Sequence, residues 1–278
     1  MVTTDYRLVR RARPPQRRRT TEVDPFGFDP EFHARARPAV EWLYRKYWRV
    51  TVEGIENVPA RGAALIVGNH SGGIPFDAVM LAAALHFDHP HPRVLRFLYD
   101  RFVDGMPLMG TIYRRLGAAV ASYENGLALA RRGDAVGIFP EGVDGIAKGL
   151  ARRYQLQRFR TGFVRISFET GCPIVPVTVV GAEEIYPVIG RWKPAGALAD
   201  LLNVPFIPVT PFFPWLGPFG AFPLPTRWHI RFGEPLRPFE KPPRRPPTRQ
   251  DFARLAETVR RRMQNTLHEM LARRDRLF

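Results

Sequence analysis

Short apolar runs alternate with segments of good helix formers between Ala63 and Val180, and a Gly or Pro marks each transition. This alternation is typical of an α/β domain, because strands laid side by side in a sheet are covered by the intervening helices. Buried strands are predicted over Ala63–Val67, Val94–Tyr99, Ala118–Ala121, Ala135–Phe139 and Ile174–Val180. Helices are predicted over Asp77–Leu85, Asn125–Arg132 and Gly162–Thr170. The predicted fold is a single α/β domain with a mostly parallel central sheet flanked by helices.

Two segments of different composition precede this domain. Residues 1–24 form a basic tail, predicted to be disordered, that lacks the apolar run of a secretory signal. Residues 25–50 contain a predicted amphipathic helix, opening at Arg37-Pro38, with aromatic side chains on one face and cations on the other. Such a helix suits a membrane surface, and it equally suits packing against its own domain.

The domain itself is placed at residues 51–245 and a C-terminal helix at 246–278. Near the end of the domain, a strand over Trp228–Phe232 is predicted to return to the sheet edge. Thr248 and Asp251 have the spacing of a capping box, which predicts where the last helix begins.

Composition bounds the class of protein. At 278 residues with 45% apolar side chains, the chain can bury one large core. Its 42 Lys and Arg against 26 Asp and Glu give a formal charge of +16, which favours anionic partners such as nucleic acid, anionic lipid or phosphorylated ligands. Cys172 is the single cysteine, so an intrachain disulfide is impossible and a reducing compartment fits. The uncharged stretch Leu201–Thr226 contains seven prolines, which break the helical ladder that a membrane span requires.

A Gly-rich turn between the first predicted strand and the first predicted helix carries His70 and Asp77. An imidazole and a carboxylate delivered together at a strand end are typical of an active-site loop, although Asp77 alone also suits a helix N-cap. Glu141 follows the predicted strand Ala135–Phe139 in the same way. Because ligand crevices form at the carboxyl ends of α/β strands, these side chains are expected to converge on one edge of the sheet.

Four clusters follow one another in order along the chain: Asn69-His70…Asp77, Phe139-Pro140-Glu141-Gly142, Arg160-Thr161-Gly162-Phe163 and Ile174-Val175-Pro176-Val177. Together they resemble the glycerolipid acyltransferase superfamily, of the bacterial lysophosphatidate acyltransferase type. The resemblance covers roughly Val52 to Val180, with a weaker likeness at Gly233-Glu234-Pro235. It implies acyl transfer from acyl-CoA or acyl carrier protein to a hydroxyl group, by a peripheral protein on the cytoplasmic face of the membrane, without a metal or other cofactor. The implied partners are an anionic membrane surface, the acyl thioester and a lipid acceptor.

The chemistry of His70 fits this implication. A neutral imidazole can remove the proton of an alcohol as it attacks a thioester, which is worth roughly 10²–10⁴-fold in rate. Asp77 would accept the other ring N–H, fix the tautomer and stabilise the imidazolium. Asn69, Glu141, Gly142 and Arg160 are predicted to bind the acceptor, and Glu141 alternatively buttresses the loop. Ser71 lacks the Gly-x-Ser-x-Gly context of a nucleophile elbow.

Three departures from the family pattern bear on the acceptor. Six residues separate His70 from Asp77 instead of the usual four. Gly72 and Gly73 lie between them and would let the longer loop bulge so that the pair can still meet. Val143-Asp144-Gly145 and Ala121-Ser122-Tyr123 stand where the family usually carries basic residues, which are associated with the acceptor's phosphate. Their absence favours either a neutral acceptor such as diacylglycerol or a relocated phosphate site. Candidates for relocation are Arg114, Arg115, Lys148, Arg152, Arg153 and Arg160.

Two other functions compete with catalysis. A non-catalytic lipid-binding protein of the same fold would result if the longer His70–Asp77 spacing broke the pair. A nucleic-acid binder would suit the charge, but the basic residues are not gathered around a recognisable reading motif. The aromatic, Pro-stiffened stretch Leu201–Thr226 fits an acyl channel, a lipid-facing surface or a cover over the core. His86, His89 and His91 match no zinc-ligand spacing.

Overall fold

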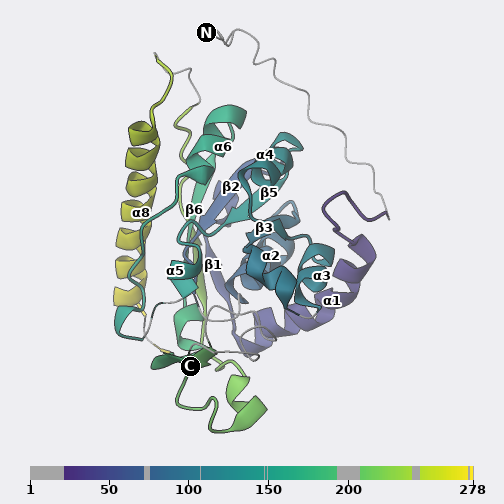
Figure 1. Ribbon diagram of the computed structural model, residues 1–278, viewed down its shortest axis with the longest axis vertical. Coiled ribbons are helices and arrows are strands. Elements are labelled where there is room, and N and C mark those ends of the chain that lie inside the picture. Colours follow the sequence, from purple (N-terminus) through teal and green to yellow (C-terminus); the bar gives the residue numbers. More distant parts are fainter. Residues whose placement is uncertain are drawn as a thin grey trace.

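A computed structural model describes residues 22–71, 76–106, 108–146, 148, 150–192, 207–239, 245–274 and 276–277 of the chain. Most of the basic tail, the glycines expected to give slack after His70, and the first part of the Pro-rich stretch lie outside the described residues. Within the described ranges, the main sheet has seven strands in the order β1-β9-β6-β2-β5-β3-β4, and helices cover both of its faces (Figure 1).

The strands of the main sheet are β1 Thr51–Glu53, β2 Ala64–Gly68, β3 Leu95–Tyr99, β4 Ala119–Val120, β5 Ala135–Ile138, β6 Ile174–Val180 and β9 His229–Phe232. Neighbours pair in parallel except β6 and β9, which are antiparallel. The mostly parallel α/β sheet predicted from the sequence is therefore correct. The expectation for Trp228–Phe232 was wrong in one respect: β9 lies one strand inside the edge, because Thr51–Glu53 pairs with it and takes the edge position.

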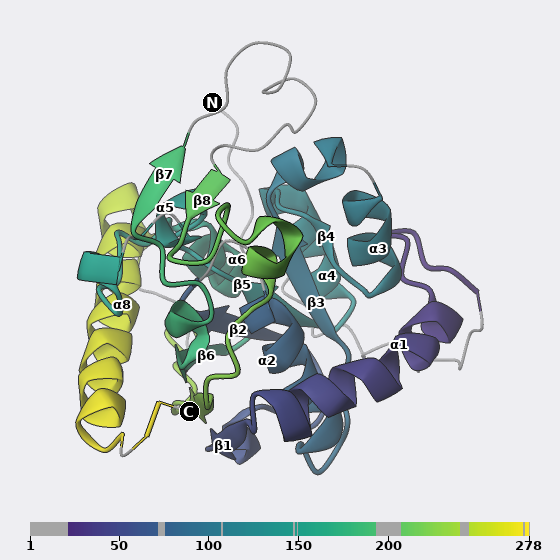
Figure 2. The same cartoon turned by 90° about the horizontal axis from the view of Figure 1, so that it is seen from below.

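The helical elements of the first half are α1 Pro30–Trp42, η1 Leu43–Tyr47, η2 Ile55–Asn57, α2 Phe76–Phe87, η3 Arg101–Gly105, α3 Met109–Arg115 and α4 Tyr123–Arg131. Those of the second half are α5 Val143–Ile146, η4 Leu150–Arg152, α6 Gly162–Thr170, η5 Ala182–Glu184, η6 Gly217–Ala221 and α8 Arg249–Ala272. A small antiparallel hairpin of β7 Gly190–Trp192 and β8 Ile207–Val209 stands apart from the main sheet (Figure 2). No helix within the described ranges is both long and apolar enough to cross a bilayer.

The core forms two layers, one on each face of the sheet. Along β2, Ala64 and Ile66 pack into the layer that contains α2, whereas Leu65 and Val67 pack into the layer that contains α4, α6 and α8. Successive strand residues point to opposite faces, and both faces are covered here, which explains why the run is continuously apolar.

The N-terminal helix begins earlier than the sequence predicted. Asp29 accepts a hydrogen bond from the N–H of Phe32, and Pro30 takes the first helical position, so α1 starts there rather than at Arg37-Pro38. Pro38 lies inside the helix. The apolar face packs against the domain through Val40 of α1 and through the fully buried Tyr44 of η1 and Trp48 after it, whereas Trp42 at the end of α1 is 56% exposed. Of the two roles expected for the amphipathic face of residues 25–50, this contact is packing against its own domain.

The last helix, α8, has the capping box predicted from the sequence. The Thr248 side chain accepts from the N–H of Asp251, and the Asp251 carboxylate accepts from the N–H of Thr248. One face of the helix then packs across α6 and β6.

Candidate active site

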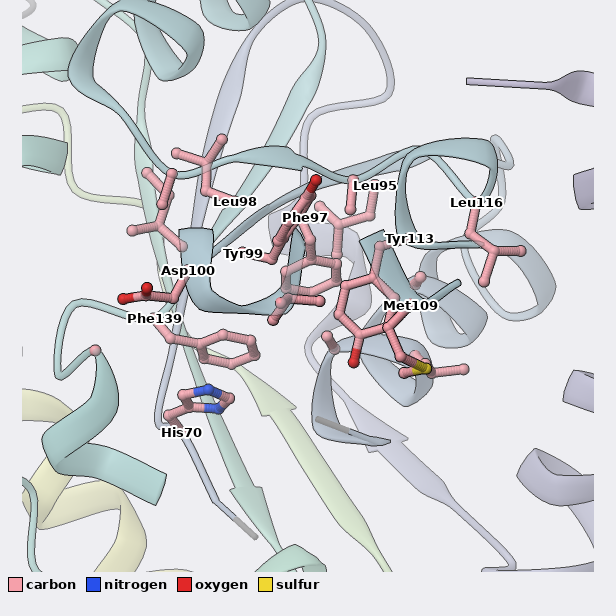
Figure 3. A pocket seen from close by; sticks show the side chains of 18 of the residues that line it. His70, Leu95, Phe97, Leu98, Tyr99, Asp100, Met109, Tyr113, Leu116 and Phe139 are labelled. Atoms are coloured by element: carbon pink, nitrogen blue, oxygen red, sulfur yellow. The ribbon is translucent and has the colours of Figure 1, made fainter. Parts of the chain in front are cut away.

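Two neighbouring strands deliver the candidate catalytic groups. β2 and β5 pair in parallel with Val67 opposite Ile138, so the segments that follow them lie side by side at one edge of the sheet. His70 follows β2, and its ring stacks on Phe139, which follows β5, with centroids 4.3 Å apart and planes 5° apart. Figure 3 shows this stack at one end of a hollow lined by apolar side chains.

The His70 ring contacts the Asp77 carboxylate despite the longer spacing between them. His70 Nδ1 lies 2.7 Å from Asp77 Oδ2, which also accepts from the N–H of Ser71 at 2.9 Å. Asp77 lies in the first turn of α2, and its Oδ1 accepts from the N–H of Ala78 at 2.8 Å. The Asp77 side chain is fully buried, whereas that of His70 is 14% exposed. A carboxylate accepts hydrogen bonds only, so Nδ1 carries a proton, and in the neutral imidazole Nε2 then has the free lone pair. No hydrogen-bond partner of Nε2 occurs among the described residues.

Glu141 fixes the His70 loop by accepting a hydrogen bond from its backbone. Its Oε1 accepts from the backbone N–H of His70 at 3.0 Å, and its Oε2 accepts from the N–H of Gln157 at 2.7 Å. Lys148 Nζ lies 3.2 Å from the same Oε2. The Glu141 side chain is fully buried, and these contacts are those of the buttressing role, one of its two predicted roles.

Lys148 connects this carboxylate to a second one. Its Nζ lies 3.0 Å from Glu183 Oε1, and Glu183 Oε2 accepts from the N–H of Tyr154 at 2.7 Å. Burial raises the pKa of Glu183, an effect that the charge of Lys148 opposes. From the sequence, Lys148 was grouped with the phosphate-site candidates and this role was missed, because no local pattern pairs it with Glu141, seven residues before it, and Glu183 lies 35 residues beyond it.

Asn69 and Gly142 take different positions. The Asn69 amide donates to the Val179 carbonyl at 3.0 Å and accepts from the Val179 N–H at 2.7 Å, so it extends the pairing of β2 with β6 and is fully buried. Gly142 has a φ of +60° and lies directly under the Arg160 guanidinium. Gly145 was missed by the sequence reasoning: a Cβ there would lie 2.9 Å from the Cβ atoms of both His70 and Glu141, so only glycine lets α5 approach the site.

His70 lines a cavity of about 450 Å³. Its walls come from α1, α2, β3, η3, α3 and the segment after β5, and they are mainly apolar (Figure 3). His33 and His86 line it as well, with ring centroids 5.7 Å apart, and burial lowers the pKa of both imidazoles. Arg160 and Gly142 contribute to the lining, whereas Asn69 and Glu141 do not. The cavity suits a long apolar ligand whose reactive end lies at His70.

The structure separates the cations proposed for a phosphate site. Arg114 pairs with Asp104, Arg115 with Asp29, and Lys148 with the two buried glutamates. Arg152 and Arg153 are exposed and lie outside the cavity lining. Arg160 lines the cavity, and no carboxylate of the described residues lies within ion-pair distance of it. Among the described residues, no group of three or more His, Cys, Asp or Glu could hold a metal.

Comparison with known proteins identifies the family. The family model described as Acyltransferase matches residues 49–180, which include His70, Asp77 and Glu141. An uncharacterised protein of Mycobacterium leprae is 42% identical over 258 residues, which cover 92% of this chain and 70% of the relative. The chain belongs to the glycerolipid acyltransferase superfamily.

Two proteins named as acyltransferases are similar over a shorter or a more divergent alignment. A probable 1-acyl-sn-glycerol-3-phosphate acyltransferase of Mycoplasma pneumoniae is 27% identical over 171 residues, 58% of this chain and 61% of the relative. The crystal structure of PlsC, the 1-acyl-sn-glycerophosphate acyltransferase of Thermotoga maritima, superposes with a TM-score of 0.56 at 18% identity, covering 88% of this chain and 80% of that one. The acyltransferase described here thus shares the PlsC fold, as the resemblance implied.

Proposed function

We propose that this acyltransferase moves a fatty acyl group from a thioester, acyl-CoA or acyl carrier protein, to the hydroxyl of a glycerolipid at the cytoplasmic face of a membrane, with His70 as general base and Asp77 as its orienting partner. One observation carries the proposal. The Nδ1 face of the imidazole is taken by a buried carboxylate, while His70 itself borders a large apolar cavity.

This geometry supports a reaction in two steps. Nε2 removes the proton of the acceptor hydroxyl as its oxygen forms a bond to the thioester carbonyl carbon. The resulting imidazolium is stabilised by Asp77, whose second oxygen stays hydrogen-bonded to the start of α2. Collapse of the tetrahedral intermediate breaks the carbon–sulfur bond, and the imidazolium returns its proton to the leaving thiolate. The acceptor itself is the nucleophile, so no covalent acyl-enzyme is required.

The cavity supports a long acyl group as the transferred unit. Burying methylene groups against apolar walls stabilises a bound chain by about 0.8 kcal/mol for each group. Val79, Ala82 and Ala83 of α2 face this space, and α2 begins at the carboxylate that holds His70. An acyl chain lying along α2 therefore brings its thioester end to the imidazole.

Arg160 supports an acceptor that carries a phosphate, such as lysophosphatidate. Its guanidinium lies over Gly142 at the His70 end of the lining, and the described residues provide no carboxylate to neutralise it. A charge-assisted contact of this kind is worth about 1.5–3 kcal/mol. Diacylglycerol is the competing acceptor, because Val143-Asp144-Gly145 and Ala121-Ser122-Tyr123 stand where the family usually carries the basic residues associated with the acceptor's phosphate.

Parallel assays with one purified protein test these assignments. Palmitoyl-CoA is offered with lysophosphatidate, glycerol 3-phosphate or diacylglycerol, and His70→Ala serves as the blank. We expect product from lysophosphatidate, with a KM raised about 10- to 100-fold in Arg160→Gln. Arg153→Gln, a matched change at an exposed arginine outside the lining, should leave KM unchanged. Product from diacylglycerol alone would reverse the acceptor assignment.

The same assay separates catalysis from lipid binding without chemistry. A non-catalytic lipid-binding protein would retain acyl-CoA and lipid but form no product with any acceptor. Wild-type turnover retained in His70→Ala would refute the role given to His70.

A further inference from the structure

Large apolar side chains are exposed together in the link between β6 and β9. We define the aromatic excursion as residues 189–192 and 207–222, the described part of this link that contains β7, β8 and η6. Its most exposed side chains are Trp215 at 73%, Phe219 at 78% and Phe222 at 69%. Trp192 and Leu216 are more than half exposed as well. Single exposed apolar residues are common on proteins, but Trp215, Leu216, Phe219 and Phe222 lie within eight residues of one another, and the rings of Phe219 and Phe222 have centroids 6.5 Å apart. Such a group indicates an interaction surface.

The backbone that carries these side chains is firmly organised. β7 and β8 form a hairpin in which Gly190 pairs with Val209, and the Thr210 hydroxyl accepts from the N–H groups of Phe212 and Phe213. Gly220 packs so closely on this turn that a Cβ would lie 2.2 Å from the Phe212 carbonyl oxygen. An ordered scaffold therefore presents the aromatic rings outward.

Topology places the excursion at the edge of the sheet that holds the candidate catalytic pair. β6 runs parallel to β2, so both end at the edge where His70 follows β2. β9 runs antiparallel to β6 and begins at that same edge. The excursion leaves and re-enters the sheet there, beyond the end of the strands (Figures 1 and 2). The Pro-rich stretch, over its described part 207–226, contributes nothing to the lining of the cavity at His70.

The chemistry of the surface selects its partner. Residues 207–226 contain no charged side chain, and the whole chain carries +16. Trp and Phe are favoured at the boundary between lipid tails and headgroups, and a basic protein is drawn to anionic lipid. By contrast, Tyr44 of η1 and Trp48 after it are buried in the core.

We propose that the aromatic excursion is the surface by which this protein docks on an anionic lipid bilayer, with Trp215, Phe219 and Phe222 entering the interface. Docking at this edge brings His70 close to the lipid from which an acceptor would come; that consequence rests on the proposed function, whereas the docking surface does not.

Vesicle binding tests the proposal. Full-length protein is mixed with vesicles of phosphatidylcholine and phosphatidylglycerol at 7:3, and the bound fraction is measured by flotation. The triple change Trp215→Ser, Phe219→Ser and Phe222→Ser should weaken partitioning at least about 30-fold, and Phe219→Ser alone about threefold or more, because binding scales with the apolar area inserted. Val23→Ser is the matched control. Val23 is 60% exposed and precedes Asp24, which pairs with Arg96 near the start of β3, away from the His70 edge.

A second measurement does not depend on a disruptive variant. Brominated phosphatidylcholine should quench part of the tryptophan emission, and Trp215→Phe, which keeps the site apolar, should remove most of that quenching while binding persists. Unchanged binding of the triple variant, or quenching unaffected by Trp215→Phe, would overturn the proposal. So would a wild-type dimer in lipid-free solution that the triple variant dissociates, because the surface would then belong to a second copy.

Activity in detergent keeps this proposal distinct from the proposed function. The triple variant should retain turnover of detergent-dispersed lysophosphatidate, whereas His70→Ala should lose turnover and still bind vesicles. A wild-type protein that docks through the excursion but acylates none of the three acceptors would leave the docking surface intact and refute the enzymatic assignment.

Discussion

Three buried charged side chains, Lys148, Glu141 and Glu183, lie next to the His70 loop and do not line the cavity. Lys148 is 3% exposed and lies between two buried carboxylates, one of which, Glu141, holds the backbone N–H of His70. Removing one member of a buried ion pair leaves an uncompensated charge, which costs far more than an exposed pair contributes. The position of the His70 backbone therefore depends on a cation seven residues beyond Glu141 in the chain.

Asp77→Asn tests the orienting role directly. A carboxamide cannot balance the charge of an imidazolium. Its NH₂ group can also donate to Nδ1 of His70, which favours the tautomer with the proton on Nε2 and removes the base. We therefore expect kcat to fall about 10²–10⁴-fold with little change in KM. Steady-state assays with palmitoyl-CoA measure this. Asp144→Asn makes the same change at an exposed position of α5 and should leave kcat within about twofold, the scatter expected for a surface site. Equal losses in both variants would contradict the assignment.

Lys148→Met should destabilise the protein, and the loss should grow with pH. The free energy of unfolding is expected to fall by about 3 kcal/mol near neutral pH. The pKa of Glu183 is already raised by burial, and removing the Lys148 charge raises it further. Because the pKa of Glu183 in the folded protein lies above its unfolded value of about 4.5, the folded protein keeps a proton on Glu183 that the unfolded chain has already released. The free energy of unfolding therefore falls as the pH rises from about 4.5 through the folded-state pKa.

Urea unfolding at pH 5 and pH 8 measures both effects. The deficit of Lys148→Met relative to wild type should be smaller at pH 5. Lys148→Arg, which keeps the charge, should recover most of the stability at both values. A deficit independent of pH would mean that Lys148 acts through packing alone.

At the scale of elements, the central strands and helices were predictable from the sequence, whereas the edge strand β1 and the start of α1 were not. β6 and α6 have the predicted bounds, and the central strands begin or end within one residue of them, because continuous apolar runs and Gly punctuation define them locally. β1 is a three-residue strand with mixed polarity, so only its pairing with β9 makes it a strand. The start of α1 differs from the prediction because Pro38, which resembles a helix start, lies inside the helix, and Asp29-Pro30 carries the cap.

Thr248→Ala should show how much the N-terminal cap of α8 contributes to the stability of the protein. Loss of the capping box leaves backbone N–H groups of α8 without partners and should cost about 0.5–2 kcal/mol of unfolding free energy. Thermal unfolding followed by circular dichroism measures it. Thr258→Ala provides the control within the same helix, because the Thr258 hydroxyl only back-bonds to the Arg254 carbonyl. That variant should be unchanged or slightly more stable, since Ala is the better helix former.

At the scale of the whole molecule, the cavity is the feature that local patterns predict least. Its walls combine α1, α2, α3 and Arg160, which are far apart in sequence. His70 and Asp77 are predictable from their residue types and their position after a strand. The cavity lining is not, and Leu201–Thr226 was one candidate for an acyl channel, because an apolar lining has no sequence signature that distinguishes it from the core until the helices are assembled.

Ala82→Phe tests whether this cavity holds the acyl chain. Ala82 lines the cavity five residues beyond Asp77 on α2, about 7.5 Å along the helix axis. A phenyl ring there blocks the path of a long chain but leaves room beside His70 for a short one. We expect kcat/KM for palmitoyl-CoA to fall at least about tenfold, an apolar mismatch of about 1.4 kcal/mol or more, while butanoyl-CoA is used as by wild type. Ala82→Val should give an intermediate loss. Equal losses for both donors, with unchanged thermal stability, would place the acyl chain outside this cavity.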